Sequence, residues 1–181
     1  MLTNPTILLR EWIEKHQKDL APPVGNKELW KDQDFVVMMV AGPNQRKDFH
    51  IEEGPEFFYQ IQGNILLRVI TEKGVEEISI KEGEVYLLPP RVPHCPIRPE
   101  GTLGMVIERK RLCHELDHIA WFCESCGEEL FRKSFHLKDI ETQLPDIFRE
   151  FYSDNHKRRC SACNEIFQPP AGWDESKKGT S

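Results

Sequence analysis

Six short apolar runs, separated by glycine turns, constrain the fold of this chain more than any other feature of its sequence. In order they read FVVMMVA, FFYQIQ, ILLRVI, VEEISI, EVYLLP and LGMVIE, and they lie within residues 35–108. The turns between them contain Gly63-Asn64, Lys73-Gly74, Glu82-Gly83 and Glu100-Gly101. Short runs rich in Val, Ile and Phe with such closely spaced turns are typical of a β-sandwich or barrel. We therefore predict a mainly β protein.

Helices are predicted on both sides of this β region. Apolar and polar residues alternate with helical spacing over residues 6–18, which predicts an amphipathic helix that begins at Asn4-Pro5. A second helical period over residues 138–152 is interrupted by Pro145. Residues 168–181 are rich in Pro, Gly, Ser and Lys, and we expect a flexible tail because they offer little apolar surface to bury.

The composition argues against two classes of partner. The 181 residues carry a net charge of −6, whereas non-specific nucleic-acid affinity comes mostly from Lys and Arg that neutralise phosphates. No apolar run approaches the roughly 20 residues of a membrane span, and the first 20 residues are too charged for a secretory signal. We expect a cytoplasmic protein whose partners are neither nucleic acids nor membranes.

Two segments carry a candidate metal site. The first, GPNQRKDFHIEEGPEFFYQIQG, contains His50 and Glu56, and the second, GEVYLLPPRVPHCPIR, contains His94. Two imidazoles and one carboxylate are the ligand set of non-haem Fe(II) oxygenases, which leaves coordination positions open. Each residue alone is an ordinary strand histidine or surface glutamate, but the spaced set between glycine turns predicts a metal site. Glu52 is an alternative ligand whose role the sequence leaves open.

Two arginines accompany these ligands. Arg46 lies four residues before His50, and Arg98 lies four residues after His94. A guanidinium is always charged and binds a carboxylate with two parallel hydrogen bonds, which suits an anionic substrate. Taken singly, either arginine is an ordinary solvated charge. Their paired placement favours a substrate cavity, and it favours iron over zinc at the ligand set.

Four of the six cysteines form two C-x-x-C pairs. The pairs are Cys123 with Cys126 and Cys160 with Cys163. Such pairs predict one tetrahedral four-thiolate site for Zn²⁺ or for a single iron, and the sequence does not separate the two metals. A structural role is the simplest interpretation of this site.

The ligand segments resemble those of the cupin superfamily. Gly63, Gly83 and Pro89 match its two motifs along with His50, Glu56 and His94. The chain departs from the pattern where Glu52 replaces a second histidine, Arg91 replaces a glycine and Arg98 stands in place of an asparagine. The resemblance implies a cupin-type double-stranded β-helix, which is a jelly-roll barrel.

Three stretches narrow the resemblance. NQRKDFHIEEGPEFFYQ, YLLPPRVPHCPIRP and VIERKR resemble the 3-hydroxyanthranilate 3,4-dioxygenase family, in the short form that carries a rubredoxin-like metal segment. This resemblance implies a catalytic barrel with its helix over residues 1–118, a four-cysteine metal segment over residues 119–167 and a tail over residues 168–181. It also implies a homodimer.

The family resemblance implies an activity. An Fe(II) enzyme would open the ring of 3-hydroxyanthranilate with O₂ and form 2-amino-3-carboxymuconate semialdehyde, the precursor of quinolinate in NAD biosynthesis from tryptophan. The second metal would be iron, with zinc as the alternative.

The resemblance also implies residue roles. His50, Glu56 and His94 would hold the catalytic iron, and Glu56 would also contact the substrate amine. Arg98 would bind the substrate carboxylate, with Glu108 beside it to orient that group or the guanidinium. Arg46 would face the dioxygen side. Candidate pocket walls are Asn26, Phe58 and Pro96, for which a core or turn role is the alternative.

Three rival interpretations remain open. The first is a non-enzymatic cupin that senses a metal and uses the cysteine site for docking. The second is a nucleic-acid-binding ribbon that uses the basic residues 156–159 beside Cys160. The third keeps the enzyme but changes the substrate to another ortho-aminophenol or to a catechol.

Overall fold

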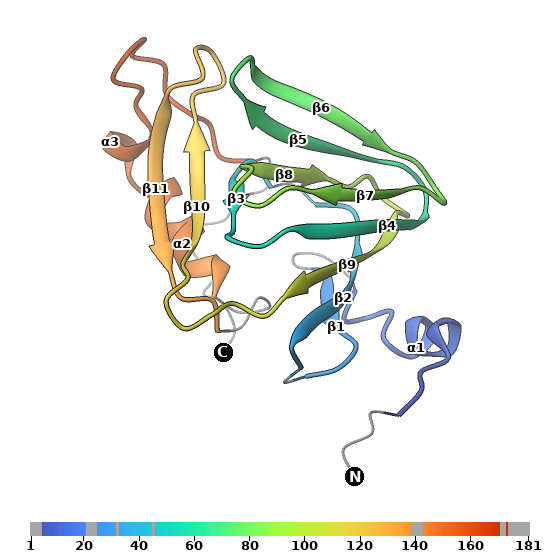
Figure 1. Cartoon of the computed structure of the whole chain (residues 1–181). Helices are drawn as coiled ribbons and strands as arrows, with labels where there is room; N and C mark the ends of the chain where they lie inside the picture. The colour runs from blue at the N-terminus through green and yellow to red at the C-terminus, as the bar shows by residue number, and fades with distance from the viewer. Residues whose placement is uncertain are drawn as a thin grey trace.

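The computed structural model describes residues 5–20, 25–31, 33–44, 46–138, 143–170 and 173. Within them the chain forms two antiparallel sheets and three helices (Figure 1). The elements in order are α1 (Leu9–Lys15), β1 (Asn26–Glu28), β2 (Phe35–Ala41), β3 (Phe49–Ile51), β4 (Glu56–Gln62), β5 (Ile65–Thr71), β6 (Gly74–Ile80), β7 (Val85–Leu88), β8 (His94–Ile97), β9 (Leu103–Arg109), β10 (Asp117–Phe122), β11 (Glu129–Phe135), α2 (Leu144–Tyr152) and α3 (Asn155–Arg158).

The two sheets pack against each other around one apolar core. The five-stranded sheet has the order β1-β2-β9-β4-β7, and the six-stranded sheet has the order β11-β10-β3-β8-β5-β6. Side chains of alternate residues point inward, as period-two strands require, and they meet in a cluster that includes Met38, Phe58, Leu67 and Val106. The predicted mainly β architecture of jelly-roll type is confirmed.

The six apolar runs correspond to β2, β4, β5, β6, β7 and β9. Five further strands were not predicted: β1, β3, β8, β10 and β11. Two of these are three-residue strands, and β8 contains a proline, so neither their length nor their composition resembles an apolar run. The N-terminal helix is confirmed as α1, although it is shorter than residues 6–18.

The region after β9 differs from the sequence prediction. β10 and β11 extend the six-stranded sheet, so the expected boundary between residues 118 and 119 falls inside β10. The helix predicted over residues 138–152 is wrong at its start, because α2 begins at Leu144 and Pro145 occupies its first turn instead of interrupting it. Residues 139–142 lie outside the described residues.

Helix α2 packs on β10 and β11 through a second apolar cluster. Ile147 and Phe151 of α2 join Ile119 and Trp121 of β10 in that cluster. Trp121 stacks on Phe151 with ring centroids 4.3 Å apart. In Figure 1, α2 lies against these two strands at the edge of the sheet. The C-terminal region is therefore held by aromatic packing onto the barrel sheet.

Part of the predicted tail is described. Trp173 packs against Tyr152 with ring centroids 4.6 Å apart, and the flexible tail over residues 168–181 stays a prediction. Residues 171, 172 and 174–181 lie outside the described residues. Among the helices described, none has the length and apolar character needed to cross a membrane.

Candidate active site

The three predicted metal ligands come from both sheets and meet between them. His50 in β3 and His94 in β8 are direct cross-strand partners, and their ring centroids are 5.3 Å apart. Glu56 opens β4 in the other sheet, and its Oε2 lies 2.7 Å from Nε2 of His94. One potential ligand atom from each of the three side chains lies within 4.8 Å of the others.

The surroundings of the two histidines suit metal binding. Nδ1 of His94 lies 3.0 Å from the carbonyl oxygen of Val92, so Nε2 is its available ligand atom. Nε2 of His50 lies 2.7 Å from Oδ2 of Asp117, so Nδ1 is its available ligand atom. Metal-binding histidines commonly donate their other ring N–H to a carbonyl or carboxylate. The residues present therefore fit a divalent metal with two nitrogen ligands and one oxygen ligand.

Burial shapes the protonation of these ligands. Burial lowers the pKa of His50 despite the neighbouring Asp117 carboxylate, which favours the neutral, metal-binding ring. Burial disfavours the charged forms of His94 and Glu56 as well, but their mutual contact outweighs it. The pKa of His94 is raised and the pKa of Glu56 is lowered, so Glu56 stays a carboxylate.

One cavity gathers the predicted cavity residues. Its lining includes Asn26, Arg46, His50, Glu56, Phe58, His94, Pro96, Arg98 and Glu108. Helix α2 adds Leu144 and Phe148 to the wall, which the sequence analysis did not anticipate. Glu52 is absent from the described lining, and its carboxylate contacts Arg111 at 2.8 Å instead.

Arg98 is a buried cation with few partners. Only 2% of the residue is exposed, Nη1 reaches Oε1 of Gln60 at 3.4 Å, and Nε has no hydrogen-bond partner among the described residues. Burial lowers its pKa to about 10, so the guanidinium still carries its charge at neutral pH. Asn44 accepts a hydrogen bond from the backbone N–H of Arg98 at 3.0 Å and donates one to the Pro96 carbonyl at 2.6 Å. This bridge fixes the strand that presents Arg98.

Arg46 already has a partner. Its Nε and Nη2 donate to the carboxylate of Asp48 at 3.1 and 2.5 Å. Burial opposes the charge, but the Asp48 carboxylate outweighs it and the pKa of Arg46 is raised. The guanidinium carbon lies 5.6 Å from the ring centroid of Phe148. Arg46 is therefore a charged side chain held in an ion pair with Asp48. Arg98, by contrast, makes no ion pair among the described residues, and only the charge of the Glu56 carboxylate supports its own.

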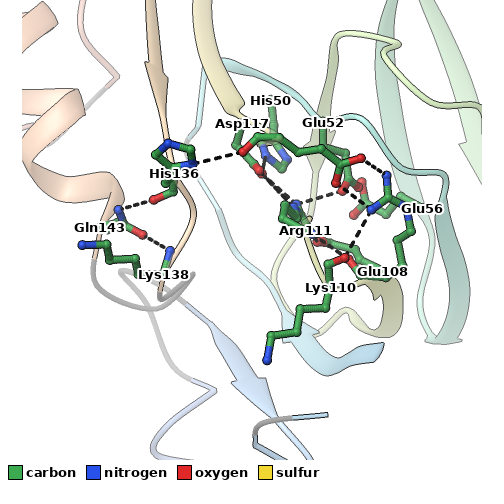
Figure 2. Close-up of polar contacts among 12 residues, drawn as sticks. His50, Glu52, Glu56, Glu108, Lys110, Arg111, Asp117, His136, Lys138 and Gln143 are labelled. Atoms are coloured by element: carbon green, nitrogen blue, oxygen red, sulfur yellow. Dashed lines mark hydrogen bonds and ion pairs between the residues drawn. The ribbon is translucent and has the colours of Figure 1, made fainter. Parts of the chain in front are cut away.

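A cluster of buried charges lies behind the ligands. Figure 2 shows Arg111 between Asp117 on one side and Glu108 and Glu52 on the other. Arg111 donates to Asp117 at 2.9 Å through Nε and at 2.7 Å through Nη2, and its Nη1 donates to Glu108. Glu108 thus pairs with Arg111, and its expected role beside Arg98, orienting the substrate carboxylate or the guanidinium, stays a prediction.

The carboxylates of this cluster differ in their protonation. Burial together with Glu108 raises the pKa of Glu52 to about 10. Burial together with Glu56 raises the pKa of Glu108 to about 7. Burial opposes ionisation of Asp117 too, but His50 and Arg111 lower its pKa to about 2. Asp117 is therefore the carboxylate that remains charged beside His50, a predicted metal ligand.

A family comparison decides where this site belongs. A family model described as 3-hydroxyanthranilic acid dioxygenase matches residues 1–152. The chain belongs to this family. The match contains every residue of the cavity and ends before Cys160 and Cys163.

Members of the 3-hydroxyanthranilic acid dioxygenase family include close relatives of the chain. The protein named 3-hydroxyanthranilate 3,4-dioxygenase of Xanthomonas oryzae pv. oryzae (strain MAFF 311018) is 46% identical over 166 residues, which are 92% of this chain and 94% of that protein. The protein of the same name from Bacillus thuringiensis (strain Al Hakam) is 43% identical over 165 residues, covering 91% and 92%. A crystal structure of a cupin-2 domain containing protein from Shewanella frigidimarina is 18% identical, covers 54% of this chain and 92% of its own, and has a TM-score of 0.44.

The four predicted cysteines form a second candidate metal site in this family member. Sγ of Cys123 lies 3.6 Å from Sγ of Cys163, and Sγ of Cys126 lies 3.5 Å from Sγ of Cys160. Four thiolates around one metal at about 2.3 Å are separated by about 3.8 Å. The four sulfur atoms lie within 4.8 Å of one another, so the cluster fits a tetrahedral Zn²⁺ or iron ion.

The two cysteine turns repeat the same local structure. The N–H of Cys123 donates to the Glu128 carbonyl at 2.7 Å, and the N–H of Cys160 donates to the Glu165 carbonyl at 2.8 Å. The residue after each second cysteine, Gly127 or Asn164, has a positive φ of 80° or 63°. Glycine and asparagine are the residues that adopt this conformation most readily, which explains why each turn closes tightly around the sulfur atoms.

Proposed function

We propose that the chain opens the aromatic ring of 3-hydroxyanthranilate with O₂ and forms 2-amino-3-carboxymuconate semialdehyde. Both oxygen atoms enter the product, and the bond between the hydroxyl-bearing carbon and its unsubstituted neighbour breaks. Family membership supports the reaction. The observation that carries the substrate is Arg98, a buried guanidinium that forms no ion pair among the described residues and lies in the cavity that also holds the three ligands.

His50, Glu56 and His94 are the proposed ligands of a catalytic Fe(II). Bound iron would supply open positions for the substrate and dioxygen and a path for electrons between them. The pKa of Glu56 is lowered, so it is a charged carboxylate that can contact the substrate amine, and its further proposed role is to take up the proton of that amine as the substrate binds. Arg98 would hold the carboxylate group, which fixes the ring so that its hydroxyl and amino groups face the ligand set.

Arg46 and Glu108 are assigned the remaining positions in the cavity. Arg46 keeps its charge through Asp48, and a preorganised cation stabilises negative charge that develops on the dioxygen side. Glu108 lines the cavity, and the pKa of its carboxyl group is raised to about 7. It can therefore donate a hydrogen bond to the substrate when protonated or accept one when ionised. Asn26 contributes a polar wall.

We infer that residues 119–167 bind a second metal ion at the cysteine site, and that the ion is iron, with zinc as the alternative. The geometry of four sulfur ligands accepts both. The ion would serve the structure, because ring cleavage by dioxygen needs no external electron. A thiolate site of this type suits the reducing conditions of the cytoplasm, which is the proposed location.

We also propose that the chain forms a homodimer through the outer face of the five-stranded sheet. Val85 and Leu87 of the edge strand β7 are 60% and 61% exposed. They lie opposite Tyr59 and Phe57 of β4 in the strand register. Apolar side chains that cross neighbouring strands on an outer face are typical of an interaction surface.

Anaerobic reconstitution with Fe(II) tests the proposed reaction. After addition of 3-hydroxyanthranilate and oxygen, we expect the absorbance of the opened ring to rise, and we expect no signal from His94→Ala. Catechol and 2-aminophenol, which lack the carboxylate, should react poorly. An iron-loaded wild-type chain that leaves 3-hydroxyanthranilate intact would refute the proposal and favour a sensor or another ortho-substituted phenol.

A further inference from the structure

Arg111 connects two parts of the site that have separate tasks. On one side, its fork binds Asp117, and Oδ2 of Asp117 also lies 2.7 Å from Nε2 of His50. On the other side, its Nη1 donates to Glu108, which lines the substrate cavity. One side chain in the connection between β9 and β10 thus contacts the partner of a metal ligand and a wall of the cavity.

The contacts of Arg111 are buried, so the loss of one charged partner is costly. The side chain of Arg111 is 8% exposed, and those of Asp117 and Glu108 are 0% and 1% exposed. Removal of one member of a buried charge pair leaves the other without compensation, unlike the loss of a surface pair. Arg111 therefore controls the placement of both carboxylates.

The planar guanidinium suits this task better than an ammonium. Nε and Nη2 donate to the two oxygens of Asp117, which fixes the rotation of the carboxylate and keeps Oδ2 directed at His50. Lysine would present a flexible point charge without this fork. Loss of the partner that orients a metal-binding histidine typically weakens metal affinity 10- to 100-fold.

We propose that Arg111 is a positioning residue that holds His50 for the metal through Asp117 and holds Glu108 for the substrate. We call the contact through Asp117 to His50 the metal branch, and it depends only on the candidate ligand set. We call the contact with Glu108 the substrate branch, and it rests on the proposed function. Arg111 itself touches neither reactant in this assignment.

The two branches are separated with three variants of the full chain. The cysteine site is first filled with one equivalent of Zn²⁺, and Fe(II) affinity is then titrated anaerobically without substrate. KM is measured separately at saturating Fe(II). The variants are Asp117→Asn for the metal branch, Glu108→Gln for the substrate branch and Arg111→Lys for both. Arg109→Lys is the matched control, because Arg109 donates to Glu115 at 2.6 Å near the surface of the same segment.

Asp117→Asn should raise the Kd for Fe(II) by about 10- to 100-fold and leave KM near the wild-type value. Glu108→Gln should raise KM and leave the Kd for Fe(II) near the wild-type value. Arg111→Lys should change both quantities, and Arg109→Lys should change neither. With Co²⁺ in place of Fe(II), the visible ligand-field bands should shift for Asp117→Asn and Arg111→Lys, which general destabilisation would not produce.

Wild-type Fe(II) affinity in folded Arg111→Lys would overturn the proposal. An unchanged KM in that variant would overturn its substrate branch. If Arg111→Lys does not fold, unchanged Fe(II) affinity in Asp117→Asn overturns the metal branch. An iron-loaded wild-type chain without turnover would refute the proposed function instead, and the metal titration would still decide the role of Asp117.

Discussion

Replacement of Arg98 by methionine should weaken substrate binding and stabilise the fold at the same time. Methionine keeps an unbranched chain of similar length in a site that is 2% exposed. The lost guanidinium makes one long contact at 3.4 Å with Gln60, and its Nε has no hydrogen-bond partner among the described residues. Apart from the attraction between Arg98 and the Glu56 carboxylate, the protein therefore loses little from its own contacts when the cation is removed.

The size of both effects follows from the burial of the charge. Burial lowers the pKa of Arg98 from its ordinary value to about 10, and a change of one unit in pKa corresponds to about 1.36 kcal/mol. The buried cation therefore costs the folded state about 3 kcal/mol, and we expect Arg98→Met to raise the free energy of unfolding by about 1–3 kcal/mol. Loss of a buried charged partner weakens binding by about 2–5 kcal/mol, which is roughly 30- to 5,000-fold in affinity.

The assay combines anaerobic substrate titration of the iron-loaded protein with urea unfolding. Arg68→Met is the matched control, because Arg68 is 33% exposed and lies 3.8 Å from Glu77 outside the catalytic cavity. The analogue 2-aminophenol, which lacks the carboxylate, should bind wild type and Arg98→Met equally. Unchanged affinity for 3-hydroxyanthranilate, or a large loss of stability in Arg98→Met, would refute the reasoning.

Three further predictions follow from the C-terminal region. Cys126→Ser should remove one metal ion per chain and lower the melting temperature while catalytic iron is retained, as metal analysis would show; an unchanged metal content would contradict the second site. Phe148→Ala should raise KM about 2- to 30-fold, because it removes part of the cavity wall and a ring contact with Arg46 worth about 0.5–2 kcal/mol. Steady-state kinetics would measure this change, and an unchanged KM would contradict the prediction. Asp154 caps α3 by accepting from the N–H of His156 at 2.8 Å, so Asp154→Ala should lower the free energy of unfolding by about 0.5–2 kcal/mol in urea, with activity unchanged.

The strands that were predicted from the sequence are those whose own apolar residues mark them as strands. β2, β4, β5, β6, β7 and β9 carry inward-facing apolar side chains at alternate positions or an apolar run, and local pattern suffices for them. β3 and β8 are short, and their histidines, His50 and His94, belong to the candidate ligand set. Their hydrogen bonds come from strands distant in sequence, so no local signal marked them. β11 reads ELFRKSF and lies at the edge of its sheet, where polar residues are tolerated.

The sequence analysis predicted the residues of the candidate site that line the cavity, but not the residues that contact them from behind. The ligands and the arginines stand in spaced segments with a family resemblance, and they line one cavity. The partners behind them were missed because sequence separation hides them: His50 and Asp117 are 67 residues apart. Arg111 stands in the quoted stretch VIERKR, but an arginine in a charged stretch gives no sign that it is buried.

Helix α2 links the cysteine site to the catalytic cavity. One face of the helix contributes Phe148 to the cavity wall, and Phe151 on the helix packs against Trp121 and Phe167. These two aromatic residues lie two positions before Cys123 and four positions after Cys163. A structural metal at four thiolates stabilises a small segment by on the order of 10 kcal/mol.

Loss of the second metal should therefore loosen the aromatic cluster and displace Phe148 from the cavity. The kinetic result would be a higher KM at an unchanged content of catalytic iron. Such a result would arise from the packing of α2 alone. A cysteine variant with reduced activity would not demonstrate electron transfer from the cysteine site, unless kcat fell while substrate affinity stayed the same.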